Sequence, residues 1–255
     1  MVSKRLLLPL SALFVAIFAV FAFVVPLPYT IIVPGSTADT LGTDQGREVV
    51  RIEGAPTYPT TGKLLLTTIL ATDPDTTIRM GRVVDAWWDG DESVVPRKSV
   101  YPEGKSVKEI VEINTADMVA SQNHAVMAAL GELGLSPQNV KVTLDLADVG
   151  GPSAGLMFSL GIVDKLNPEN LTGGRVVAGT GTIDDRGNVG AVGGVPMKLK
   201  AAVRDGATVF LVPRDECDTA TRDKPGGLRL VPVETLDDAI ASLRALDTGG
   251  RVPSC

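Results

Sequence analysis

The chain contains few of the residues that metal and nucleotide chemistry require. Among 255 residues there is one histidine, His124, and there are two cysteines, Cys217 and Cys255. Because these three side chains cannot form a standard zinc site, we expect no metal. The sequence has no Gly-x-x-x-x-Gly-Lys-Ser/Thr loop for ATP, and the run Gly179-x-Gly181 lacks the third glycine of a dinucleotide fingerprint. We therefore expect neither ATP nor any other cofactor.

Positive charge and aromatic side chains are also scarce. The formal net charge is −6, and no basic cluster follows the N-terminal Lys4-Arg5 pair. This balance argues against a nucleic-acid-binding surface. Aromatic residues make up 4% of the chain and apolar residues 44%. The length is sufficient for a sizeable core, which we expect to be aliphatic.

A glycine-rich motif surrounds Ser153. Residues 150–155 have the sequence Gly-Gly-Pro-Ser-Ala-Gly, and the apolar run over residues 154–166 predicts a helix. The Ser153 hydroxyl would then lie at a helix N-terminus, near unpaired N–H groups that favour negative charge. This placement suits a nucleophile, although a tight turn into a buried helix would use the same residues.

A lysine 45 positions later has unusually apolar neighbours. Lys198 follows Val195, Pro196 and Met197 and precedes Leu199. Desolvation lowers the pKa of a lysine, and a neutral amine can accept a proton from a serine. We therefore predict a Ser153–Lys198 pair of nucleophile and general base.

The motif is also compatible with two histidine-dependent arrangements. Its Gly-x-Ser-x-Gly pattern fits the nucleophile elbow of α/β-hydrolases, but that chain order needs a histidine after the serine. His124 precedes Ser153. A His–Asp–Ser order, with His124 and either Asp145 or Asp148, remains formally open. The helix-like surroundings of His124, rich in alanine and methionine, disfavour it.

The region from 116 to 246 resembles the proteolytic domain of Lon-type serine peptidases. The shared features are Pro-Ser-Ala-Gly, then Thr-Gly with a short hairpin that ends in Gly-Gly, then the lysine four positions later. The resemblance implies an α/β (α+β) Lon proteolytic-domain fold. It assigns Ser153 as nucleophile, Lys198 as base and Thr180 as the hydroxyl that orients the lysine. Backbone groups around Gly151, Pro152 and Ala154 would form the oxyanion hole.

At one position this chain departs from many Lon enzymes, and its serine motif is more similar to one branch of the family. Many ATP-dependent Lon enzymes carry an aspartate three residues before the serine, where this chain has Gly150. The Gly-Gly-Pro-Ser form instead is similar to the membrane-anchored, ATPase-free branch, which often carries a PDZ domain. Only residues 132–140 separate the expected helix over 116–131 from the strand that enters the serine turn, so we expect no PDZ domain. Hexameric assembly is implied by the resemblance alone.

The N-terminal segment predicts one transmembrane helix. Residues 6–25 are apolar apart from a proline and a serine, and about 20 such residues span a bilayer. The basic pair before them should stay cytoplasmic, which places the rest of the chain outside. A cleaved signal peptide is the alternative, but the run is long and no Ala-x-Ala site follows it. An extracytoplasmic domain permits disulfides, so we hypothesise a Cys217–Cys255 bridge.

These features predict four segments. Residues 1–28 form the basic tip and membrane anchor. Residues 29–115 supply membrane-proximal strands and a link, including a strand over 29–33 that ends in a Pro34-Gly35 turn, a strand over 48–53 and a buried strand over 63–70. We expect Thr115 to be the N-cap of the helix over 116–131. Residues 116–246 form the Lon-like domain, and residues 247–255 form a tail. The strand over 63–70 is either a core strand or the edge to which an extended substrate adds.

The function expected from the sequence is hydrolysis of envelope polypeptides. The protein would be a membrane-anchored, single-pass, ATP-independent serine endopeptidase with its catalytic domain outside the cell membrane. A catalytically silent, membrane-tethered binding module of the same fold is the alternative. The intact set of Ser153, Thr180 and Lys198 favours the enzyme, because a binding module does not need all three.

Overall fold

The computed structural model describes residues 4–147 and 149–255, with the side chains of residues 4–8 outside the description. The chain divides into two compact units. One unit comprises the chain up to Val33 together with Ala71–Lys105, and the other comprises Pro34–Leu70 and Ser106–Cys255. Strand β1 (Tyr29–Asp39) runs from the first unit into the second.

The first unit is built around one short amphipathic helix. Helix α2 (Met80–Trp88) packs the buried Val83 and Ala86 against Ile31 and Ile78. The first half of β1 pairs antiparallel with β6 (Ser93–Pro96), which leads into the 3-10 helix η1 (Arg97–Ser99). Helix α1 (Lys4–Val24) contacts α2, and the Val24 carbonyl accepts a hydrogen bond from Arg79 Nε at 3.2 Å.

The predicted transmembrane helix is not supported. Among the residues that the structure describes, no helix is both long enough and apolar enough to cross a membrane. Helix α1 does form over most of the predicted segment, and its large apolar side chains from Leu10 to Val24 are exposed. The first residues of the predicted span, 6–8, have side chains outside the described part.

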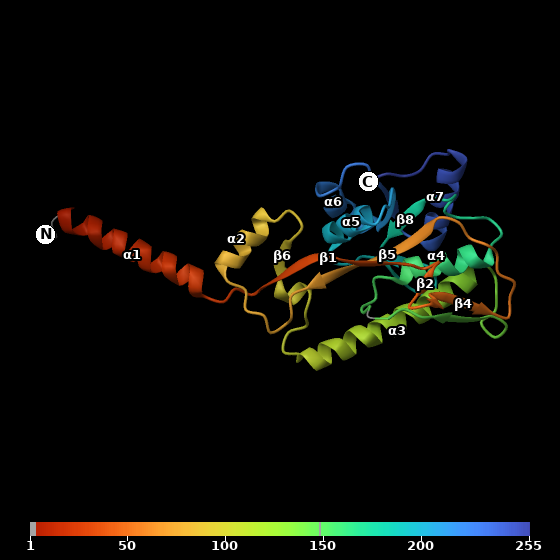
Figure 1. The fold of residues 1–255 in the computed structure, drawn as a ribbon, viewed down its shortest axis with the longest axis horizontal. Coiled ribbons are helices and arrows are strands. Elements are labelled where there is room, and N and C mark those ends of the chain that lie inside the picture. The colour runs from red at the N-terminus through yellow and green to blue at the C-terminus, as the bar shows by residue number, and fades with distance from the viewer. Residues whose placement is uncertain (1–3, 148) are drawn as a thin grey trace. The chain divides into compact units, whose positions relative to one another are not determined.

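The second unit contains a largely parallel sheet between two helical layers. Strands β5 (Lys63–Ala71), β8 (Val176–Gly179), β11 (Val209–Pro213) and β12 (Arg229–Val233) are parallel where they pair, and the sheet order continues from β5 to β1. Alternation along β11 divides the core: Leu211 belongs to the cluster with α3, α4 and α7, whereas Phe210 belongs to the cluster with α5. In Figure 1, α5 lies above β5 and α3 lies below it. The predicted mixed α/β class is confirmed.

The helices around this sheet are of different lengths. The bounds are α3 (Val107–Glu132), α4 (Gly155–Leu166), α5 (Val195–Arg204), α6 (Cys217–Arg222) and α7 (Leu236–Thr248), with the 3-10 helix η2 (Arg214–Glu216) before α6. Three antiparallel pairs complete the unit: β2 (Thr43–Asp44) with β3 (Arg47–Glu48), β4 (Val50–Glu53) with β7 (Lys141–Leu144), and β9 (Thr182–Ile183) with β10 (Val189–Gly190).

Two predicted boundaries were wrong. The strand over 29–33 does not turn at Pro34-Gly35 but continues to Asp39, where it passes so close to β5 that a Cβ on Gly35 would lie 2.3 Å from Thr68 Oγ1. Thr115 is not a helix N-cap, because α3 runs unbroken from a capping box at Ser106. The Thr115 hydroxyl instead donates to the carbonyl of Val111 one turn earlier, a bond that helices accommodate.

Candidate functional site

Ser153 lies in the turn that enters α4. The helix begins at Gly155, two residues after the serine, so the hydroxyl stands just before the first turn, close to where the sequence predicts it. Gly155 allows this turn to approach its neighbours closely. A Cβ at this position would lie 2.8 Å from Ile183 Cγ2 and 3.0 Å from Ser121 Oγ. Any larger residue would push the serine turn away from the β9 strand.

Thr180 connects the sheet to this turn. It is fully buried and directly follows β8, whose parallel neighbours end at the same edge of the sheet. Its hydroxyl donates to the Ser153 carbonyl at 3.2 Å, and the N–H of Gly181 donates to the same oxygen at 3.0 Å. The main chain of the serine is therefore fixed to the carboxyl end of β8.

Lys198 approaches Thr180 from the opposite helical layer. It lies on α5, whose N-cap Gly194 has a φ of +72° and packs against Ile69. The lysine side chain is buried, with 3% of the residue exposed, and Nζ donates to Thr180 Oγ1 at 2.9 Å. Burial lowers the pKa of Lys198 to about 8, although the negative charge of Glu216 acts in the opposite direction.

Thr180 therefore links Lys198 to the main chain of Ser153 at one edge of the sheet, and within the described residues no hydrogen bond joins the Ser153 hydroxyl to Lys198. Lys198 donates to Thr180, and Thr180 donates to the main chain of Ser153. The serine arrives with α4 on one face of the sheet and the lysine with α5 on the other. Ligands of parallel α/β sheets bind beyond the carboxyl ends of the strands, which is the position of Thr180. Such an arrangement can hold a neutral amine next to a serine turn.

Two groups that sequence reasoning missed hold the serine loop against α3. The Gly151 N–H donates to the Asn114 carbonyl at 2.9 Å, and Ser121 Oγ donates to the Pro152 carbonyl at 3.0 Å. Since proline has no N–H and that of Gly151 is bonded, these two residues offer no donor to an oxyanion, whereas Ser153 and Ala154 each carry an N–H group in the same turn. No local signal marks Asn114 or Ser121, because they meet the loop only through tertiary packing.

The histidine-dependent arrangement finds no support in the side-chain contacts. His124 Nδ1 lies 2.7 Å from Asp185 Oδ1, in the loop between β9 and β10. Asp145 pairs instead with Arg47 at 3.1 Å. Asp148, the other acid considered, lies outside the described residues. His124 therefore has an acidic partner that the sequence did not predict, and the triad through Asp145 does not form.

The two cysteines are joined in a disulfide. Cys217 begins α6 and Cys255 is the last residue of the sequence, with their Cα atoms 5.2 Å apart. Val252, three residues before Cys255, is buried. The bridge closes a loop of 38 residues and holds the tail to α6, one residue from the Glu216 that influences Lys198.

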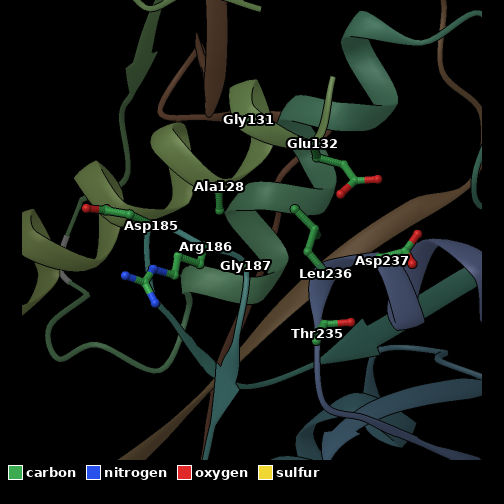
Figure 2. A pocket seen from close by; sticks show the side chains of 9 residues that line it. All are labelled: Ala128, Gly131, Glu132, Asp185, Arg186, Gly187, Thr235, Leu236 and Asp237. Carbon is green, nitrogen blue, oxygen red and sulfur yellow. The ribbon is translucent and has the colours of Figure 1, made fainter. Parts of the chain in front are cut away.

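A separate pocket of about 460 Å³ lies between α3, the β9–β10 loop and the start of α7 (Figure 2). Neither Ser153 nor Lys198 lines it. Figure 2 shows Asp185 and Arg186 on one side and Glu132 and Asp237 on the other, with Leu236 between them. Because these charged groups do not converge, we assign the pocket no role. In the part of the chain with described placement, no group of histidine, cysteine, aspartate and glutamate could hold a metal ion.

Comparison with known proteins identifies the family. Residues 116–245 match the Lon protease (S16) C-terminal proteolytic domain. Lon protease of Clostridioides difficile (strain 630) is 38% identical over 94 residues, which cover 35% of this chain and 12% of that protein. Lon protease 3 of Sorangium cellulosum (strain So ce56) is 32% identical over 161 residues, covering 58% of this chain and 19% of that protein.

Lon protease 2 of Bacillus subtilis (strain 168) is 24% identical over 150 residues, which cover 58% of this chain and 26% of that protein. The chain thus spans about a quarter or less of each of these three relatives. The family match, by contrast, covers just over half of the chain and includes Ser153, Thr180 and Lys198. The chain belongs to the family of Lon protease (S16) C-terminal proteolytic domains.

Proposed function

We propose that this protein is an ATP-independent serine endopeptidase, with Ser153 as nucleophile, Lys198 as general base and Thr180 as the residue that orients the lysine. One observation carries the proposal: a buried lysine with its pKa lowered to about 8 donates a hydrogen bond to a threonine that is itself bonded to the serine turn. Family membership supports the peptidase class.

The reaction would begin with proton transfer to Lys198. In its neutral form, the amine accepts the Ser153 Oγ proton as the oxygen attacks the carbonyl carbon of the scissile peptide. Thr180 accepts an Nζ–H bond, which holds the amine while leaving its lone pair for the serine proton. The resulting ammonium then protonates the leaving amine. Water hydrolyses the acyl-serine, with Lys198 again accepting and returning a proton.

The turn before α4 would stabilise the tetrahedral intermediate. We assign the oxyanion to the N–H groups of Ser153 and Ala154, since that of Gly151 is bonded to Asn114. The start of α4 adds the positive end of a 12-residue helix dipole. Loss of an oxyanion donor typically costs about 10²–10³-fold in kcat.

We propose that an extended substrate adds to β5. Strand β8 pairs with β5 only from Lys63 to Leu66, so Thr67–Leu70 extend beyond the last pair. These residues lie on the side of the site, because Thr67 Oγ1 donates to the Gly179 carbonyl and Ile69 packs against Gly194. An added strand would bring its scissile bond to the carboxyl end of β8. Flexible or unfolded polypeptides fit this mode best.

ATP independence and assembly are part of the proposal. The sequence has no phosphate-binding loop, which supports turnover without a nucleotide. Self-association into a ring, as the Lon resemblance implies, would then confine substrates by geometry alone. Size-exclusion chromatography with light scattering tests the assembly.

We further propose that the catalytic unit works outside the cell membrane on envelope polypeptides, attached through α1. The exposed apolar side chains of α1 support attachment to lipid, and the Cys217–Cys255 disulfide supports an oxidising compartment. Cysteine alkylation of envelope-derived protein before reduction tests the location, since two alkylated thiols would contradict it.

The test of the activity is casein degradation without ATP by the full chain. Ser153→Ala, Lys198→Met and His124→Ala are compared, with Lys141→Met as a control for loss of an exposed lysine. The proposal predicts cleavage that is lost in the first two variants and retained in the others. Cleavage that survives Lys198→Met and falls in His124→Ala would assign the base to histidine. No cleavage by any variant would favour a binding module of the same fold.

A further inference from the structure

Helix α2 ends in two exposed tryptophans. Trp87 and Trp88 are the only tryptophans in the chain, and 79% and 86% of their respective surfaces are exposed. Val83 and Ala86, on the other face of α2, are buried in the core of the unit. Two adjacent indoles expose a few hundred Å² of mainly apolar surface, which is the size of patch that marks an interaction site.

The tryptophans belong to the same compact unit as α1. Arg79, the N-cap of α2, donates to the last carbonyl of α1, and Leu27 forms a β-bridge with Ile78. The nine residues of α2 span about 14 Å at 1.5 Å per residue. The indoles therefore lie about 14 Å along α2 from the residue that contacts the C-terminal end of α1, whose apolar side chains are exposed.

We propose that Trp87 and Trp88 insert into the headgroup layer of the membrane to which α1 attaches, an inference that rests on the attachment proposed above. Indole suits this layer because its ring is apolar and its N–H can donate to lipid carbonyl or phosphate oxygens. Within the described part of the chain, neither indole N–H has a hydrogen-bond acceptor. The tryptophan pair would fix the orientation of the first unit at the surface.

The exposed charges next to the tryptophans are negative, which favours a neutral lipid over an anionic one. Asp85 and Asp89 flank the tryptophans and are exposed, while Arg82 is occupied by a bidentate pair with Glu92 at 2.5 and 2.7 Å. Anionic lipid would therefore be repelled, and the pair fits a zwitterionic surface.

Tryptophan fluorescence tests this directly, because it reports on the pair alone. The full chain is mixed with phosphatidylcholine vesicles, either plain or brominated on the acyl chains near the glycerol, and sedimentation is measured in parallel. The proposal predicts sedimentation, a blue shift, strong quenching by bromine and protection from aqueous iodide. Replacement of part of the neutral lipid by phosphatidylserine should not increase the quenching. Trp87→Phe and Trp88→Phe assign the signal to each ring.

Three results would overturn the proposal in distinguishable ways. Sedimentation with emission that remains iodide-accessible and unaffected by bromine would retain attachment through α1 and reject the tryptophans. Failure to sediment would reject attachment as well. A blue shift that depends on protein concentration but not on bromine would assign the pair to a second copy of the chain. Casein cleavage by the Trp87→Phe and Trp88→Phe proteins is measured separately. It tests the peptidase proposal, which can hold or fail whatever the lipid experiments show.

Discussion

The pH dependence of turnover follows from the burial of Lys198. Its pKa falls from 10.5 to about 8, which corresponds to about 3 kcal/mol against the charged form. At pH 7.5, about a quarter of such lysines are neutral, against about one in a thousand for an exposed lysine. Burial therefore raises the population of the active base about 200-fold at this pH.

The measurement is kcat/KM for a flexible fluorogenic peptide from about pH 6 to pH 10. Below pH 8, the rate should rise about tenfold per pH unit and then level off. Glu216→Gln should shift the rise to lower pH, because the Glu216 charge raises the pKa of Lys198. Asp218→Asn, an exposed change of the same type on α6, should leave the profile unchanged.

A rise centred near pH 6.5 would indicate a histidine base and refute the assignment of Lys198. A profile in which Glu216→Gln produces no shift, or a shift to higher pH, would refute the electrostatic reasoning. Glu216→Gln should leave the fold intact, because Glu216 is the N-cap of α6 but makes no side-chain capping hydrogen bond.

Three further predictions concern stability, each measured by denaturant unfolding. Lys198→Met should raise the free energy of unfolding by up to about 3 kcal/mol below pH 8. The pKa of Lys198 is lower in the folded than in the unfolded protein, so the lysine reduces the stability of the protein as pH falls from 10.5 through 8. A gain that persists above pH 10.5 would contradict this. Within the described part of the chain, one carboxylate oxygen of the buried Asp164 has no hydrogen-bond partner, and burial raises the pKa of this group to about 6. Asp164→Asn should stabilise the protein by up to about 3 kcal/mol above pH 6. The cost of charging the buried carboxyl group appears as pH rises from 3.8 through 6, and the asparagine does not have this cost. An equal gain at pH 3 would show that the stabilisation does not come from the charge. Cys255→Ser should cost about 4 kcal/mol through loss of a 38-residue loop closure, and Cys217→Ser about the same; full stability in either variant would show that the bridge does not constrain the unfolded chain.

Local chemistry predicted much of the site. An apolar run after Pro-Ser-Ala-Gly predicted the helix that begins at Gly155, and the apolar neighbours of Lys198 predicted its burial. The contact between Lys198 and Thr180 was expected only from the Lon resemblance. Their separation of 18 residues is bridged by the β9–β10 hairpin and the turn into α5, whose geometry no single-residue propensity determines.

Long-range contacts account for what the sequence could not predict. Pro34-Gly35 has the composition of a turn, yet the pair remains extended because Gly35 allows β1 to approach Thr68 of β5. Thr115 has a strong preference for helix N-caps, but packing of α3 against α4 outweighs it. His124 meets Asp185 from 61 residues away, a contact with no local signal.

The central claim is that Ser153 is a nucleophile activated by Lys198. The most direct test is reaction of the full chain with a fluorophosphonate, which phosphonylates activated serines, followed by mass-spectrometric mapping of the labelled residue. The account predicts one adduct, on Ser153, whose formation is lost in Lys198→Met and retained in Lys141→Met. An adduct on another residue, or undiminished labelling of Ser153 in Lys198→Met, would contradict it.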